Sequence, residues 1–166
     1  FSATIYRAEK INTHGGSLRI YVKNHSNIKV EKSVKMLINE EEKFGIKDYQ
    51  TYVNFAKKVY KIRDNVRKNI SILSKNNNII GYGSPAKATT ALNFFGISTE
   101  IQCIVEDNKL KQGKFLPGMK IPITSKEKIK TKPDLAIVLA WNFFDEIKRK
   151  NGKLAHKLIN IKDLEI

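Results

Sequence analysis

The stretch from 76 to 96, NNNIIGYGSPAKATTALNFFG, constrains the fold of this chain more than any other. A short β-branched run breaks into Gly81-Tyr82-Gly83, and a helical pattern follows that ends at Gly96. A glycine turn that joins an apolar strand to a helix is typical of nucleotide-binding α/β units with a parallel sheet. This turn therefore predicts a Rossmann-like unit in the second half of the chain.

The remaining segments agree with that prediction. IQCIVEDN, PDLAIVLAWN and HKLINI are predicted strands, and SKEKIK and FFDEIKRK are predicted helices. Earlier in the chain we predict a strand over 16–23, a helix over 32–44 that ends at Gly45, and a longer helix from about Asp48 to Leu73. The predicted fold class is α/β: a Rossmann-like three-layer unit with a mainly parallel sheet, preceded by a strand and two helices.

The length of 166 residues suits one domain with a full core. We predict a single domain over 1–166, with a strand and helical lead-in over 1–75 and an α/β nucleotide-binding unit over 76–166. The chain begins within a patterned segment and without Met, so we expect it to be part of a longer protein. It has no apolar run of about 18 residues and no signal-peptide pattern. We expect a cytoplasmic protein with no membrane partner.

The formal net charge of +15 is high enough to raise the question of a polyanionic partner. Most of the basic residues are lysines, however, and they are scattered among abundant Ile and Asn residues. We attribute the charge to compositional bias and expect no nucleic-acid partner. The single cysteine, Cys103, lies in an apolar run and predicts a buried, inert thiol, with no disulfide and no metal site.

The glycine turn has the residue types that an anion site needs. The order G-x-G-x-x-A, from Gly81 to Ala86, is the short dinucleotide-binding fingerprint, in which the small alanine lets the helix pack near the strand. Ser84 is a good N-cap and Pro85 suits the first helical position, so free N–H groups are expected to face an anion. Lys87 is a cation in the first turn and opposes the helix dipole, and a phosphate beside it would offset this unfavourable interaction. The alternative is an ordinary helix start with Lys87 in solvent.

Polar residues also follow two other predicted strands. Glu106 and Asp107 come about 25 residues after Gly81, near the position of the ribose-binding acid in Rossmann units. Trp141 and Asn142 end the strand AIVLAWN. Because the carboxyl ends of parallel strands line one crevice, these residues are candidates for ligand binding. The alternative for Asn142 is a plain cap of the helix that follows.

The segment THGGSLRIYV, over 13–22, is a further candidate region. Its two glycines precede a strand and predict a bulge or a tight turn that leaves backbone open to a ligand. Ser17 and Arg19 lie on the same face of that strand. The alternative for His14 and Arg19 is that they are ordinary surface side chains that bind no ligand.

Four blocks together resemble the C-terminal domain of the S-adenosylmethionine-dependent sugar-nucleotide C-methyltransferases. They are THGGSLRIYV, GYGSPAKATTALNFFGI, EDNKLKQGKFLPGMKIPI and PDLAIVLAWNFFDEI. The resemblance implies a role in deoxysugar biosynthesis, with a nucleoside-diphosphate sugar as ligand. It also implies that S-adenosylmethionine binds to a middle domain and zinc to an N-terminal region. Both domains are partners outside this chain, which would contain no catalytic residue, no metal site and no site for S-adenosylmethionine.

The resemblance also implies which residues face the ligand. They are His14, Gly15, Gly16, Ser17, Arg19, Gly81, Gly83, Ser84, Pro85, Lys87, Asp107, Lys111, Trp141 and Asn142. Ser84 and Ala88 depart from the Ala and Gly that are usual in the family, and both are small enough to preserve the turn. Two other functions stay open: an NAD(P)-type domain of an oxidoreductase, and a non-catalytic docking domain.

Overall fold

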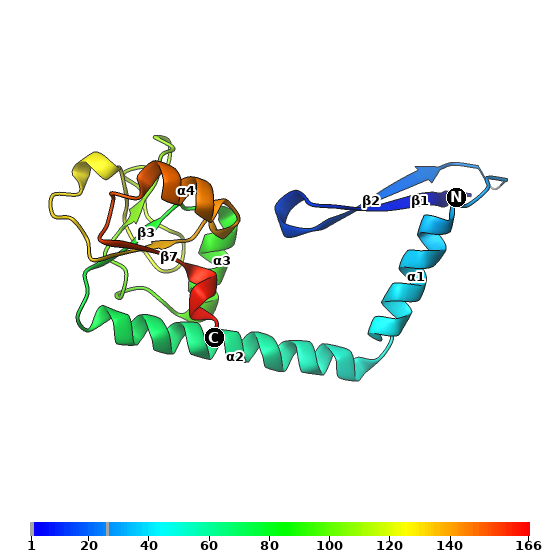
Figure 1. Ribbon diagram of the computed structural model, residues 1–166, viewed down its shortest axis with the longest axis horizontal. Helices are drawn as coiled ribbons and strands as arrows, with labels where there is room; N and C mark the ends of the chain where they lie inside the picture. Colours follow the sequence, from blue (N-terminus) through cyan, green and yellow to red (C-terminus); the bar gives the residue numbers. More distant parts are fainter. Residues whose placement is uncertain (1, 26) are drawn as a thin grey trace. The chain divides into compact units, whose positions relative to one another are not determined.

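The computed structural model describes residues 2–25 and 27–166. The chain divides into two compact units, one up to Lys57 and one from Lys58 to Ile166. The boundary falls within the long helix α2 (Tyr49–Ser74), whose bounds agree closely with the predicted helix (Figure 1). That all of these residues form a single domain stays a prediction.

The first unit is a β-hairpin with a helix beside it (Figure 1). Strand β1 (Thr4–Ile11), which is not among the predicted elements, pairs antiparallel with β2 (Ser17–Lys23). The 3-10 turn η1 (Thr13–Gly15) joins the two strands. Helix α1 (Lys32–Phe44) ends as predicted, because Gly45 adopts the left-handed conformation that caps a helix.

The hairpin of the first unit buries little of its apolar surface. Ala8 is the one buried side chain among those described up to Lys57, and its N–H donates a hydrogen bond to Ser33 Oγ of α1. Leu18, Ile20 and Val22 follow one another at every second position of β2 and therefore share one face. Each of them stays about half exposed.

The second unit contains the predicted parallel sheet. Its five strands run parallel in the order β5-β4-β3-β6-β7. They are β3 (Ile79–Tyr82), β4 (Ile104–Val105), β5 (Ile123–Thr124), β6 (Leu135–Val138) and β7 (Lys157–Asn160). The prediction missed β5, which has only two residues.

Helices and turns connect these strands. Helix α3 (Ala86–Phe95) follows β3 and ends at Gly96 as predicted, while α4 (Phe144–Asn151) follows β6. Three 3-10 turns complete the unit: η2 (Lys126–Lys128), η3 (Trp141–Phe143) and η4 (Ile161–Leu164). The segment SKEKIK, predicted as a short helix, forms η2 and no α-helix, since its three-residue turn is followed by an extended Ile129.

Alternate residues of the central strands enter two separate cores. Ile79 and Ile137 pack in a cluster that includes residues of α2 and α3, whereas Ile80 and Val138 pack in a cluster with Phe144 of α4. Successive side chains of a strand point to opposite faces of the sheet. Helices on both faces therefore explain why these strands are apolar throughout, and they confirm the three-layer prediction.

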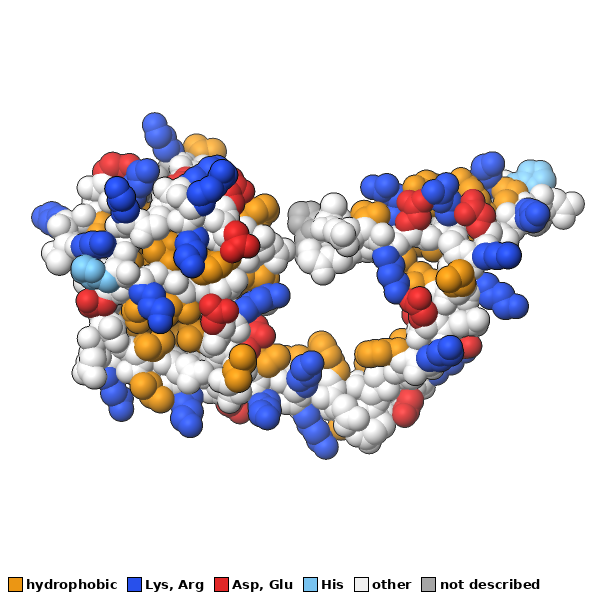
Figure 2. Space-filling model, in the orientation of Figure 1, with side chains coloured by type: hydrophobic (Ala, Val, Ile, Leu, Met, Phe, Trp, Pro, Cys, Tyr) orange, Lys and Arg blue, Asp and Glu red, His pale blue; other side chains and the backbone are white. Residues whose placement is uncertain are grey.

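Charged side chains cover much of the remaining surface. On the face shown in Figure 2, lysine and arginine side chains are spread over each unit, with acidic side chains between them. None of the described helices combines the length and the apolar character needed to cross a membrane. Cys103 is half-buried rather than fully buried, and burial raises the pKa of its thiol.

Candidate functional site

Three strands of the second unit end beside a crevice of about 330 Å³, close to the glycine turn. Among the predicted site residues, those that line it are Gly83, Ser84, Pro85, Asp107 and Lys111. The prediction missed Tyr82 and Asn151, which also line the crevice. The parallel order of β4, β3 and β6 brings these residues together, as expected for carboxyl ends at one sheet edge.

The two glycines of the turn are required by their neighbours. Gly83 has φ +84°, and a Cβ built there would lie 3.1 Å from Ala140 Cβ. A Cβ at Gly81 would lie 3.1 Å from Ile104 Cγ1 and 3.1 Å from Leu139 Cδ1. Close packing therefore accounts for Gly81, and close packing together with a positive φ accounts for Gly83, whether or not a ligand approaches.

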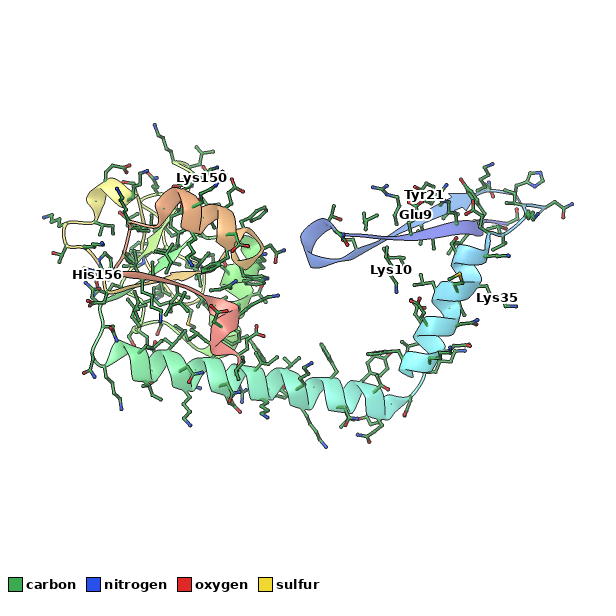
Figure 3. The ribbon with its side chains drawn as sticks, viewed as in Figure 1. Glu9, Lys10, Tyr21, Lys35, Lys150 and His156 are labelled. Atoms are coloured by element: carbon green, nitrogen blue, oxygen red, sulfur yellow. The ribbon has the colours of Figure 1, made fainter. Side chains whose placement is uncertain are left out.

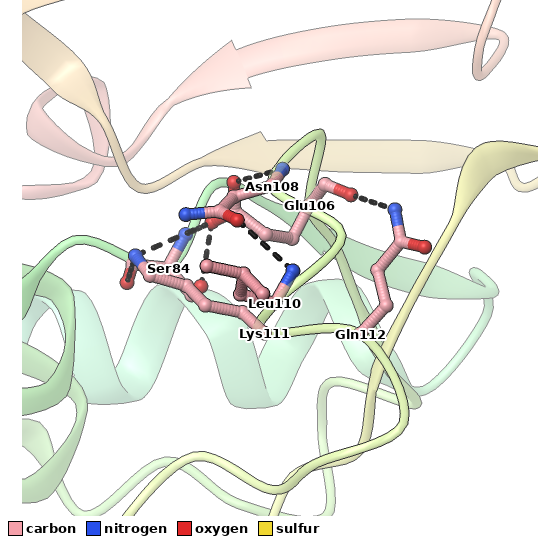
Figure 4. Close-up of polar contacts among 6 residues, drawn as sticks. All are labelled: Ser84, Glu106, Asn108, Leu110, Lys111 and Gln112. Atoms are coloured by element: carbon pink, nitrogen blue, oxygen red, sulfur yellow. Dashed lines mark hydrogen bonds and ion pairs between the residues drawn. The ribbon is translucent and has the colours of Figure 1, made fainter.

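Ser84 binds Glu106 instead of capping the helix (Figure 4). The Ser84 hydroxyl donates to Glu106 Oε2 at 2.6 Å, and the Ser84 N–H donates to the same oxygen at 2.8 Å. Pro85 is the N-cap residue and α3 begins at Ala86, so the predicted N-cap and first helical residue are wrong by one position. Ala88 is fully buried and Ala86 is exposed, so Ala88 provides the close packing predicted for Ala86.

The loop after β4 closes around this contact (Figure 4). Glu106 Oε1 accepts the Asn108 N–H at 3.0 Å, and Gln112 Nε2 donates to the Glu106 carbonyl at 2.7 Å. Lys111 Nζ donates to the Ser84 carbonyl at 2.8 Å and lies 3.8 Å from Glu106 Oε2. We call these five residues the Glu106 clasp. Burial disfavours the charged carboxylate, but the hydrogen bonds and Lys111 together hold the pKa of Glu106 below its usual range.

The clasp changes what the glycine turn can bind. The Gly83 N–H donates to Val105 O, and the Ser84 N–H donates to a carboxylate. The expectation that the amides after Gly83 are free to hold a diphosphate is therefore wrong for Ser84. An anion placed there would meet the negative charge of Glu106 at close range.

A second polar network also lines the crevice. The buried Tyr82 hydroxyl donates to Asp107 Oδ2 at 2.6 Å and accepts from Asn151 Nδ2 at 2.9 Å. Burial, and then the Asp107 carboxylate, raise the pKa of Tyr82, so the phenol stays neutral. Asp107 is exposed, as expected of a ligand-facing acid, but one of its oxygens is already used within the chain.

Lys87 and Trp141 lie together at the start of α3. The Lys87 ammonium is 4.1 Å from the centroid of the Trp141 ring, within the range of a cation–π interaction. Burial and the nearby charge of Lys162 lower the pKa of Lys87. None of the ion pairs between described residues includes Lys87. Its ammonium is thus partly desolvated and has an aromatic face, not a carboxylate, as its neighbour.

Asn142 does not have the capping role considered as its alternative. It lies exposed within η3, and the N-cap residue of α4 is Phe143, without a side-chain hydrogen bond to the helix. Its amide is therefore not engaged in capping. Ligand binding by Asn142 stays a prediction.

The remaining predicted residues belong to the first unit. Gly15 and Gly16 have φ of 90° and 117° and form the tight turn between β1 and β2. Gly16 and Ser17 line a concave surface of about 620 Å³ against α1, and Ser17 Oγ donates to Thr13 O at 3.0 Å. Arg19 is exposed and pairs in register with Glu9, which accepts a hydrogen bond from Tyr21 (Figure 3). The side chain of His14 lies outside the described part of the chain.

Comparison with known proteins gives two matches. Residues 12–160 match the profile of a family described as C-methyltransferase C-terminal domain. The chain is also similar to C-methyltransferase NovU of Streptomyces niveus, with 33% identity over 140 residues. The match covers 82% of this chain and 33% of that protein, so the chain spans about a third of the length of this relative. Both matches agree with the resemblance found in the four sequence blocks.

Proposed function

Because the chain belongs to the family of C-methyltransferase C-terminal domains, we propose that it holds the nucleoside-diphosphate part of a sugar-nucleotide substrate. The substrate would be a deoxyketo sugar in deoxysugar biosynthesis, and the reaction would be cytoplasmic. S-adenosylmethionine would supply the methyl group from a different domain of a longer enzyme, and zinc would bind to yet another region. This chain would bind and orient the substrate without transferring the methyl group itself.

The single observation that supports this proposal best is the state of Lys87. Its ammonium lies beside Trp141 at the first turn of α3. It forms no ion pair with any carboxylate of the described residues. A partly desolvated cation gains stability when an anion binds, because burial has already removed part of its hydration. A nucleoside diphosphate brings about two negative charges together with an aromatic base.

The NAD(P) alternative is disfavoured by the Glu106 clasp. In dinucleotide-binding units the pyrophosphate lies against the backbone of the glycine turn. Here the Glu106 carboxylate accepts the Ser84 N–H at that turn, so a pyrophosphate would have to displace a largely buried carboxylate, whose side chain is 13% exposed. A docking role without ligand binding remains the second candidate, and the large exposed apolar residues of the first unit favour it.

Calorimetric titration of the chain tests the proposal. We expect weak binding of dTDP and of a dTDP-sugar, no binding of NAD, and no binding of S-adenosylmethionine. Lys87→Glu should abolish the binding of dTDP, because it replaces the cation with a like charge. Tight binding of S-adenosylmethionine would contradict the assignment of the chain to the C-terminal domain role. An absence of heat with every ligand would favour the docking role.

A further inference from the structure

The second unit contains a groove of about 450 Å³ that is separate from the crevice. Residues of α2 and α3 line it, among them Val59, Ile62 and Phe94. Lys87 and Thr90 are the polar residues of the lining, and all lining residues are described. Its volume lies within the range of small-molecule sites, and its walls are predominantly apolar, as such sites usually are.

Aromatic rings form one part of this groove. Trp141 is half-buried, and Phe94 is 39% exposed, so both present ring surface to a ligand. The Phe94 ring centroid lies 5.9 Å from that of Phe95 and 6.1 Å from that of Tyr60. Such surfaces favour a flat, apolar group, since aromatic stacking adds to the gain from buried area.

The charges of the groove and of the crevice differ in sign. Lys87 is the charged residue of the groove lining and has no carboxylate partner among the described residues. The crevice has Lys111 and Lys150, and each of them pairs with a glutamate, Glu106 or Glu146. Asp107 is a third acidic residue of the crevice, so the crevice lining has more acidic than basic side chains. An anionic ligand is therefore attracted to the groove and repelled by the crevice.

We infer that this groove binds the nucleoside diphosphate, with its base against Trp141 and Phe94 and a phosphate against Lys87. This inference rests on the proposed function and names the surface that carries it out. It also explains why Lys87 occurs in the first turn of a helix, where a cation opposes the helix dipole. The groove lining offers few hydrogen-bonding groups, so recognition of the base edge should be weak.

Fluorescence provides a direct test, because Trp141 is the single tryptophan of the chain. We expect dTDP to quench the emission of Trp141 as the base stacks nearby. Ala91→Phe, which places a large ring in the groove, and Lys87→Met should each weaken the binding of dTDP by about tenfold or more. Thr90→Phe repeats the obstruction at an exposed position, in case Ala91→Phe disturbs folding.

Two matched variants serve as controls. Lys150→Met removes a cation from the crevice, and Lys68→Met removes one from the exposed surface of α2. Both change the net charge by the same amount as Lys87→Met, and we expect both to leave dTDP binding within about twofold of the original. Loss of binding in Lys150→Met but not in Lys87→Met would assign the nucleotide to the crevice and overturn the inference.

Other outcomes separate this inference from the proposed function. If calorimetry shows dTDP binding but Ala91→Phe and Thr90→Phe leave it unchanged, the groove is not the site and the proposed function stands. If no nucleotide binds, the proposed function fails. In that case, binding of the aromatic anion 8-anilinonaphthalene-1-sulfonate tests whether the groove is a ligand site. Binding that depends on Lys87 and Ala91 supports a site for aromatic anions, and binding indifferent to both variants overturns it.

Discussion

The two units of this chain have similar proportions of apolar residues and use them in opposite ways. In the second unit the strands are buried on both faces, and their side chains form two cores. In the first unit the hairpin leaves one face of β2 about half exposed, and Ala8 is the one buried side chain among those described. The second unit therefore contains the packing it needs, whereas the first has apolar surface available for further contacts.

Their polar groups show the same contrast. In the second unit Glu106 is only 13% exposed in its side chain and accepts hydrogen bonds from Ser84 and Asn108. In the first unit the Glu9 side chain is more exposed, at 29%, and accepts from Tyr21 and Arg7. Because buried polar groups depend on protein partners and exposed ones exchange them with water, equal substitutions should have unequal effects.

The largest expected effect comes from paired substitutions of isoleucine. Ile137→Ala, at a fully buried position of β6, should lower the free energy of unfolding of the second unit by about 2–5 kcal/mol, because it leaves a cavity. Ile20→Ala, at a position that is 50% exposed, should cost the first unit less than about 1 kcal/mol. Native-state amide exchange in each unit measures both values. Equal losses would show that the exposed face of β2 is covered in solution.

A smaller effect is expected from paired substitutions of glutamate. Glu106→Gln should destabilise the second unit by about 1–3 kcal/mol, since it disrupts a buried carboxylate with several donors. The pKa of Glu106 is lowered on folding, so this stability is present above the ordinary glutamate pKa of about 4.3 and is lost as the pH falls through the folded pKa. The difference between the original chain and Glu106→Gln should therefore shrink on acidification.

Glu9→Gln is the control for that experiment. Hydrogen bonds from Tyr21 and then Arg7 lower the pKa of Glu9, but these groups are at the surface. Added salt should therefore reduce the effect of Glu9→Gln and leave that of Glu106→Gln nearly unchanged. Urea denaturation at low and high ionic strength compares the two. A strong salt dependence for Glu106→Gln would contradict the buried clasp.

The smallest effect is expected from paired substitutions of tyrosine. Tyr82→Phe removes the hydroxyl between Asp107 and Asn151 and should cost about 1 kcal/mol. Tyr21→Phe removes one hydrogen bond to Glu9 at the surface and should cost less than about 0.5 kcal/mol. Thermal unfolding of the two variants provides the measurement. A larger loss for Tyr21→Phe would reverse the contrast between the units.

Much of the fold was accessible to sequence analysis because its signals are local. Apolar spacing predicted α1 and α2 within about one residue at each end, and Gly45 and Gly96 adopt the left-handed conformation that ends a helix. Apolar runs predicted β3, β6 and β7. The prediction missed β1, which lies at the start of the chain, and β5, because two residues are too few to show a period.

The candidate site was accessible only in part. The glycine turn, Asp107, Lys87 and Trp141 follow from residue types placed at strand ends, which a linear pattern reveals. The hydrogen-bond partners of these residues could not be predicted in this way. Ser84 and Glu106, for example, are 22 residues apart and meet only when β3 and β4 pair. The aromatic groove was missed for the same reason, since α2 and α3 each contribute one wall of it.

Local periodicity and turn chemistry thus specified the kinds of element, their order and the position of the glycine turn. Which donor meets which acceptor was decided by the packing of the sheet, which turned the Ser84 N–H toward a carboxylate and left the Lys87 ammonium beside an indole ring. The physical reason is range. Backbone propensities act over a few residues, whereas hydrogen bonds and charges act between any groups that folding brings within a few ångströms.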